Sequence, residues 1–172
     1  ERINAVPDDL VCQGSVRFLD KDSGMAFWAE FRRVLDSVCP LNYCSYRLRV
    51  PEFLLPTINT PACTKLFRDA AKEYLGPDSV YECEPWMASE TFSFICNMIP
   101  GVNSFTGIRD DRYGSGANHH TPEFDIAEEG LIYGVAAALG YVLNYLESPP
   151  DLSDFQPVCE NMEDLIAMLR NA

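Results

Sequence analysis

The two histidines are the first candidates for chemistry, because they are adjacent in the chain, at His119 and His120. They follow a glycine-rich stretch and precede a predicted helix, and junctions between strands and helices are where α/β enzymes place functional loops. Neutral imidazole is a good ligand for Zn, Mn or Co, which makes a metal site the functional hypothesis. The alternative is a pair of surface-loop imidazoles without a role. Since no HxD, HxH or HExxH spacing occurs, further ligands would have to come from another chain or from sequence outside this one.

Glu90 is the second candidate, as a general base at the start of a predicted helix. The alternative is structural, because a carboxylate in the first turn of a helix interacts favourably with the helix dipole. Other chemistries find no support. The chain has no GxSxG sequence for a serine nucleophile, and neither GxGxxG nor GxxxxGK[ST] for binding phosphates.

The cysteine pattern indicates thiols rather than a disulfide framework. There are seven cysteines, an odd number, without a CxxC pair, and secreted disulfide-rich proteins normally have an even count. We therefore expect buried or half-buried thiols in a reducing cytoplasm. Cys39 and Cys44 flank a predicted turn and are the pair to check for a disulfide bond.

The charge balance is strongly acidic. With Lys+Arg 13 and Asp+Glu 26, the formal net charge is −13, and the cations are scattered. Such a chain repels nucleic-acid phosphates and anionic lipid, which argues against either as a partner. No apolar window is long enough to cross a bilayer. The first residues resemble neither an initiator region nor a signal peptide, so we expect a piece of a longer protein.

The elements that would position these residues follow from hydrophobic spacing. Helices are predicted from Asp22 or Ser23 to Pro40, from Pro61 to Gly76, from Ser89 or Glu90 to before Pro100, from a capping box at Asp125 and Glu128 to about Leu146, and near the C-terminus. Strands are predicted at residues 10–19, 44–50, 80–81 and 102–108. Three prolines between residues 51 and 61 indicate a domain boundary or hinge.

Four segments in a fixed order resemble one enzyme family, the aminoacylase/carboxypeptidase G metallopeptidases (M-twenty peptidases). The resemblance is greatest to the amidohydrolase branch, with hippurate, N-acyl-amino-acid and auxin-conjugate hydrolases. The segments are Asn4-Ala5-Val6-Pro7-Asp8, Gly14-Ser15-Val16-Arg17, Met87-Ala88-Ser89-Glu90-Thr91-Phe92-Ser93 with Ile99-Pro100-Gly101 beyond it, and His119-His120-Thr121-Pro122-Glu123-Phe124-Asp125 with the helix that follows.

This resemblance implies an α/β fold class, in which an α+β lid remnant precedes the carboxy-terminal part of an α/β metallopeptidase catalytic domain. Residues 1–57 would be the second half of the lid or dimerisation domain and residues 58–172 the catalytic part. The implied protein is a homodimer through the lid. The acidic tail after about Pro149 has no counterpart in the family.

The resemblance also implies roles for single residues. His120 would be one ligand of a divalent metal pair (Zn, Mn or Co), while Asn4, Arg17 and Glu90 would bind an N-acyl amino acid or small peptide. Arg17 suits this role because guanidinium binds carboxylate with two hydrogen bonds. Thr91, Ala127 and Ala88 depart from the family pattern, so the site floor is expected to differ. The alternatives are a non-catalytic dimerising or interaction module of this family and an unrelated α/β binding domain.

Overall fold

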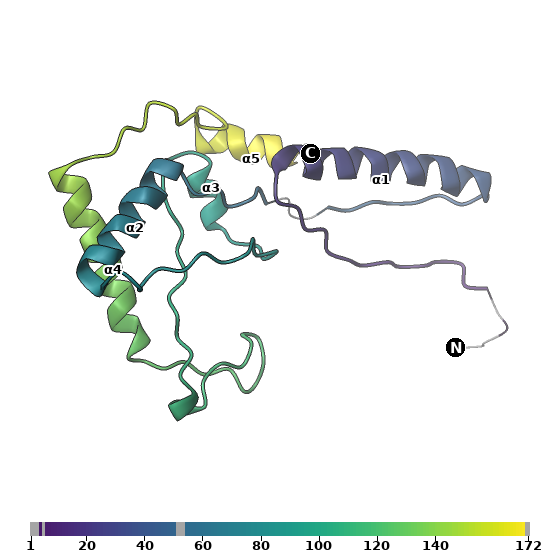
Figure 1. The fold of residues 1–172 in the computed structure, drawn as a ribbon. Helices are drawn as coiled ribbons and strands as arrows, with labels where there is room; N and C mark the ends of the chain where they lie inside the picture. Colours follow the sequence, from purple (N-terminus) through teal and green to yellow (C-terminus); the bar gives the residue numbers. More distant parts are fainter. Residues whose placement is uncertain (1–3, 5, 51–53, 171–172) are drawn as a thin grey trace.

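The structure, a computed structural model, describes residue 4 and residues 6–50 and 54–170. Figure 1 shows α1 and the irregular segments on either side of it projecting away from the other helices. We call residues 6–50 the arm and residues 54–147 the body. The elements in chain order are α1 (Lys21–Leu41), α2 (Pro61–Leu75), α3 (Phe92–Cys96), the short 3-10 helix η1 (Asp111–Tyr113), α4 (Gly130–Glu147) and α5 (Met162–Arg170).

The expected α/β fold class is wrong, because the described residues form helices and no β-strand. The four segments predicted as strands, residues 10–19, 44–50, 80–81 and 102–108, are irregular chain. A strand forms only where the N–H and C=O groups of two extended segments bond in a ladder. Among the described residues, no two of these segments make such bonds. The alternation of side chains was therefore not sufficient to predict a β-strand, because it does not show whether a second segment lies alongside to form the backbone hydrogen bonds.

The N-cap of helix α1 lies two or three residues before the predicted cap at Asp22 or Ser23, and the helix ends later than predicted. Asp20 is its N-cap and accepts a hydrogen bond from the Ser23 N–H at 2.8 Å. Pro40 does not stop the helix, which ends at Leu41. The returning segment of the arm runs back along α1 (Figure 1), and the Tyr46 hydroxyl donates to the Asp36 carboxylate at 2.7 Å. This contact places one side of residues 44–50 against the helix.

Helices α2 and α4 are in broader contact than any other helix pair in the described part of the chain. Helix α2 begins at Pro61 and ends before Gly76 (φ +103°), as the sequence predicted. Ala70 is fully buried, and the Tyr74 ring lies where a Cβ at Gly140 would be. The small residues of α4 therefore let a neighbouring helix approach closely, although the neighbour is α2 and not the sheet that we expected.

Helix α4 begins at Gly130, and the predicted capping box of Asp125 and Glu128 does not form. Instead the Ala127 N–H donates to the Ile108 carbonyl at 2.8 Å, which fastens the residues before the helix to the preceding segment. A Cβ at Gly130 would lie 2.8 Å from the Gly107 carbonyl oxygen. Only glycine permits this approach, because real Cβ atoms do not come so close to backbone oxygens.

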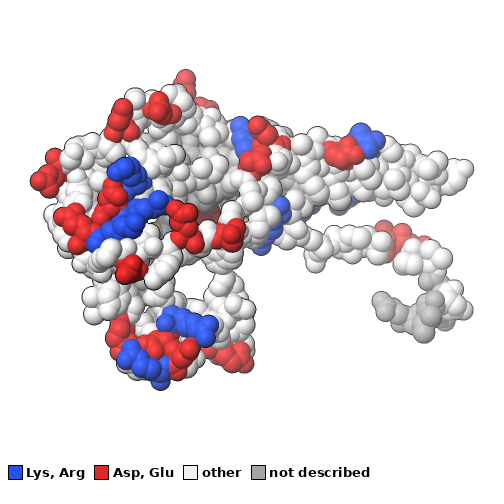
Figure 2. Space-filling model, in the orientation of Figure 1, with Lys and Arg blue, Asp and Glu red and all other residues white. Residues whose placement is uncertain are grey.

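The cysteines are all free thiols, including Cys39 and Cys44, which are not bonded to each other. Cys63 and Cys96 are buried and Cys39 and Cys159 are half-buried, whereas Cys12, Cys44 and Cys83 are exposed. In the described residues, no helix is both long and apolar enough to cross a bilayer. On the face shown in Figure 2, Lys and Arg lie beside Asp and Glu, and Lys65–Asp69 and Arg68–Glu82 are ion pairs.

Candidate functional site

Three of the four predicted site residues line one cleft. Arg17, Glu90 and His120 come from the arm, from the start of α3 and from the loop before α4, and meet around an open cavity of about 630 Å³. All three side chains are exposed. The remaining lining residues are Thr57, Asn59, Trp86, Met87, Ala88, Ser89, Asn103, Phe105 and His119. Asn4, the fourth predicted residue, is exposed and does not line this cleft.

Arg17 crosses from the arm to the body. Its Nη1 donates to the Ser89 hydroxyl at 2.5 Å. Ser89 is the residue directly before Glu90 in the sequence. Guanidinium has five N–H donors, so this bond leaves donors for a ligand carboxylate. Ser89 was not singled out from the sequence. Its position directly before Glu90, in the segment that carries the family resemblance, was the available signal.

Glu90 lies just before α3 and holds the start of that helix. Its Oε1 accepts from the Phe92 N–H at 3.3 Å and from the Thr91 hydroxyl at 3.1 Å. The Phe92 N–H first, and then the Thr91 hydroxyl, lower the pKa of the Glu90 carboxyl below its ordinary value. A lowered pKa makes a carboxylate a weaker base, which favours a charged acceptor over a general base. Glu90 thus contacts the start of α3 from outside the helix, and not from its first turn as we expected, and it lines the cleft as well.

The two histidines end an aromatic row in the cleft. The ring centroids of His119 and His120 are 4.7 Å apart, and the Trp86 ring lies 5.2 Å from His119 and 5.2 Å from Phe105, with all three pairs edge-to-face. Trp86 and Phe105 were not predicted as site residues, because spacing along a sequence does not show that two residues far apart in the chain lie side by side in the fold. An exposed Trp next to a family segment was the one usable hint.

His120 has a left-handed backbone conformation, with φ +67°. Such values are uncommon for residues other than glycine, although histidine tolerates them better than most. The turn that holds it is closed by the Thr121 hydroxyl, which donates to the Asn118 carbonyl at 2.7 Å. Strained backbone of this kind clusters at functional sites because it aims a side chain. Here it aims the imidazole into the cleft.

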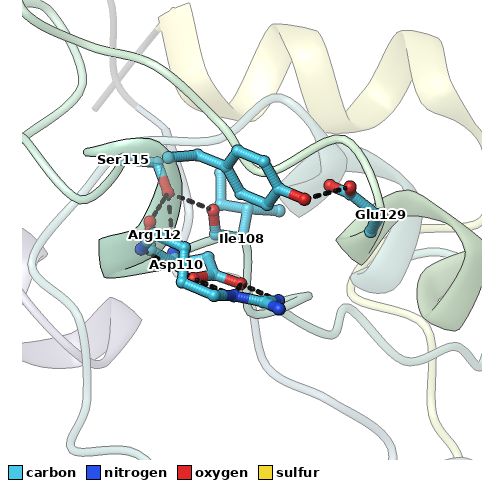
Figure 3. A network of polar contacts seen from close by, with 6 residues as sticks. Ile108, Asp110, Arg112, Ser115 and Glu129 are labelled. Carbon is cyan, nitrogen blue, oxygen red and sulfur yellow. Dashed lines mark hydrogen bonds and ion pairs between the residues drawn. The ribbon is translucent and has the colours of Figure 1, made fainter.

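A closed polar network supports the loop that leads to the histidines (Figure 3). The Ser115 hydroxyl is buried, accepts from the Asp110 N–H at 2.7 Å and lies 3.2 Å from the Ile108 carbonyl oxygen. Arg112 pairs with the Asp110 carboxylate, which lowers the pKa of Asp110. At the start of α4, Tyr113 donates to Glu129 at 2.8 Å. The loop is therefore anchored at both ends.

The donors in the cleft do not make a complete metal site. In the part of the chain that the structure describes, no group of three or more His, Cys, Asp and Glu side chains could hold an ion. The chemistry of His120 suits one ligand of a divalent ion, but a catalytic ion needs about three protein ligands. The described residues therefore fit part of a metal site and do not enclose one.

Comparisons with known proteins agree with the motif order. Residues 7–144 match the Peptidase family M20/M25/M40. The chain is 30% identical over 147 residues to IAA-amino acid hydrolase ILR1-like 4 of Arabidopsis thaliana, covering 83% of this chain and 33% of that protein. It is 26% identical over 142 residues to putative amidohydrolase YhaA of Bacillus subtilis, covering 83% and 36%. The chain thus spans about a third of the length of these relatives. No solved structure matches it significantly.

Proposed function

The chain belongs to peptidase family M20/M25/M40, and we propose that it is the carboxy-terminal portion of a metal-dependent amidohydrolase that cleaves N-acyl amino acids or small peptides. One observation carries this proposal. Arg17, Glu90 and His120 are far apart in the sequence and line a single cleft. The names of the relatives, an IAA-amino acid hydrolase and an amidohydrolase, support amide hydrolysis of amino-acid conjugates as the reaction class.

His120 has the metal-binding role in this proposal. Its imidazole supplies one ligand to a divalent pair of Zn, Mn or Co, and the other ligands come from residues outside those described. Such a pair polarises the scissile amide and lowers the pKa of the attacking water. The cleft is open, so the residues of this chain do not exclude water from it. By itself the chain is expected to be inactive, because one imidazole without the remaining ligands cannot assemble the metal pair.

Arg17 and Glu90 have the substrate-binding roles. The Arg17 guanidinium binds the carboxylate of the amino-acid portion, while Ser89 fixes its direction through the 2.5 Å hydrogen bond. Glu90, an exposed carboxylate, accepts a hydrogen bond from a substrate N–H. A cation and an anion in one cleft suit a ligand with both a carboxylate and N–H donors. A role of Asn4 near the substrate carboxylate remains a prediction.

The substrate role of Arg17 is tested in the full-length gene product that contains this chain. Arg17→Ala is expected to raise KM by roughly 10- to 100-fold for N-acyl amino acids, because charge-assisted hydrogen bonds contribute about 1.5–3 kcal/mol. The matched substrate is the corresponding amino-acid amide, which lacks the free carboxylate and should show an unchanged KM. Equal effects on both substrates would refute the carboxylate contact.

A second candidate is a non-catalytic module of the same family that dimerises. The observation in its favour is the apolar surface of α4, where Ile132, Val135 and Leu146 are each more than two-thirds exposed. Large exposed apolar patches mark interfaces. A hydrolysis assay distinguishes the candidates, with light scattering to measure the oligomeric state: a full-length product that is a stable dimer and hydrolyses no N-acyl amino acid supports the module, whereas hydrolysis supports the enzyme.

A further inference from the structure

The segment after α4, residues 148–170, lies beyond the region that matches the family, which ends at residue 144. It nevertheless has defined structure. The Asp151 carboxylate accepts from the Ser153 N–H at 2.9 Å. Asn161 precedes α5 and exchanges two hydrogen bonds with Asp164, accepting from its N–H at 2.9 Å and donating to its carboxylate at 2.7 Å. In Figure 1, α5 lies near the start of α1 and next to α3.

A backbone hydrogen bond and a cluster of apolar side chains join this segment to the body. The Val158 N–H donates to the Asn97 carbonyl at 2.9 Å, and the Asn97 amide in turn donates to the Pro56 carbonyl at 3.1 Å. Leu165 of α5 has no exposed surface and packs with the buried Leu55. The half-buried side chains around them, on the body, on the segment before α5 and on α5 itself, are Phe94, Met98, Val158, Cys159, Met168 and Leu169.

The same cluster also receives two side chains of the arm. Phe18 and Trp28 pack against the cluster formed by Leu55 and Leu165. Leu165 therefore lies where the arm meets the body. Phe18 directly follows Arg17, whose guanidinium bonds Ser89 in the cleft. The position of Arg17 in the cleft is thus coupled, through one peptide unit, to the packing of Phe18.

Helix α1 of the arm makes no broad contact with another of the described helices. Of the helices described, only α2 and α4 are in broad contact with each other. The hydrogen bond from Arg17 to Ser89 joins two exposed side chains. Its net contribution to stability is small, because water competes for the same donors and acceptors. Buried apolar area is the larger stabilising contribution. The buried contact between arm and body is the cluster that Leu165 of α5 forms with Leu55 of the body.

We propose that residues 148–170 are an internal strap, in which Leu165 pins Phe18 and Trp28 against the body and so holds Arg17 in the cleft. Leu165 is a positioning residue in this arrangement, since it acts on the cleft only through Phe18. The strap itself stands independently of any role of Arg17 in hydrolysis. Its test accordingly measures the arm and not activity.

The experiment is amide hydrogen exchange, followed by mass spectrometry, on the full-length gene product that contains this chain. In Leu165→Ala, exchange in α1 is expected to become at least about tenfold faster while exchange in α2 and α4 stays within about twofold, because local opening releases the arm alone. Ile166→Ala is the matched control. It removes an aliphatic side chain of the same size from the next position of α5, where the side chain is exposed, and should leave all helices unchanged.

Two results would overturn the strap. One is unchanged exchange in α1 of Leu165→Ala; the other is an equal acceleration in every helix, which would make Leu165 a core residue of a single cooperative unit. If Leu165→Ala does not fold, Met168→Ala, which trims a half-buried member of the same cluster, must still accelerate α1 selectively. Absence of that selectivity contradicts the proposal as well.

Discussion

Helices α4 and α1 are both largely exposed, but they are held in opposite ways. Helix α4 uses small residues, so that the Gly107 carbonyl and the Tyr74 ring approach its backbone at Gly130 and Gly140. Helix α1 buries one glycine, Gly24, and otherwise relies on the large side chains beside it. The difference indicates that α4 is held by close approach of neighbouring elements to its backbone. The arm depends instead on the packing of Phe18 and Trp28 in the cluster that includes Leu165 of α5.

The largest effect is expected from Gly130→Ala. The added Cβ would lie 2.8 Å from the Gly107 carbonyl oxygen, a backbone atom that cannot rotate away. Overpacking of this kind costs roughly 1–3 kcal/mol, and an alanine in the first helical position recovers little of it. Urea denaturation measures the loss. Gly107→Ala is the control, because a Cβ there meets nothing within 4 Å; similar stabilities of the two variants would contradict close backbone packing.

A smaller effect is expected from Gly24→Ala. The new Cβ would lie 2.7 Å from the Phe18 ring, but a ring can shift where a backbone cannot. Alanine also gains about 1 kcal/mol of helix propensity over an interior glycine, so the net change in unfolding free energy should be under about 1 kcal/mol. Tryptophan fluorescence should still change, since Trp28 packs in the same cluster as Phe18. A loss as large as that of Gly130→Ala would mean that the arm is packed as rigidly as α4.

The smallest effect is expected from Asp110→Asn in the loop before α4, and it should depend on pH. Arg112 lowers the pKa of Asp110 in the folded chain, so the carboxylate stabilises the fold above its unfolded pKa of about 4 and this contribution is lost as pH falls through the lower folded value. The difference in Tm between the wild type and Asp110→Asn should therefore be present at pH 7 and shrink as the pH falls below the unfolded pKa of Asp110. A difference that is constant with pH would exclude the ion pair as its cause.

The helices could be predicted from the sequence because their signals are local. Spacing of apolar residues located α1, and Pro61 and Gly76 bounded α2. The strands could not, since alternation along one segment says nothing about a hydrogen-bonding partner, and none is present among the described residues. The start of α4 was missed because the tie from Ala127 to Ile108 is a contact between distant segments.

The candidate site shows the same division. The order of family segments predicted that Arg17, Glu90 and His120 have roles at one site, and the structure lines one cleft with all three. The aromatic row of Trp86, Phe105 and His119 was not predicted, because it depends on where two loops meet. Asn4 does not line the cleft. Its position depends on the path of the chain before α1, which the family segment containing Asn4 does not predict.

The central claim, that His120 supplies one ligand to a hydrolytic metal pair, is tested most directly by bound metal and hydrolysis in the full-length gene product. His120→Ala should reduce bound Zn, Mn or Co and lower kcat for an N-acyl amino acid by at least about 100-fold, as expected for loss of a metal ligand. His119→Ala, which alters the neighbouring ring, should retain the metal. Normal metal content and turnover in His120→Ala would contradict the account.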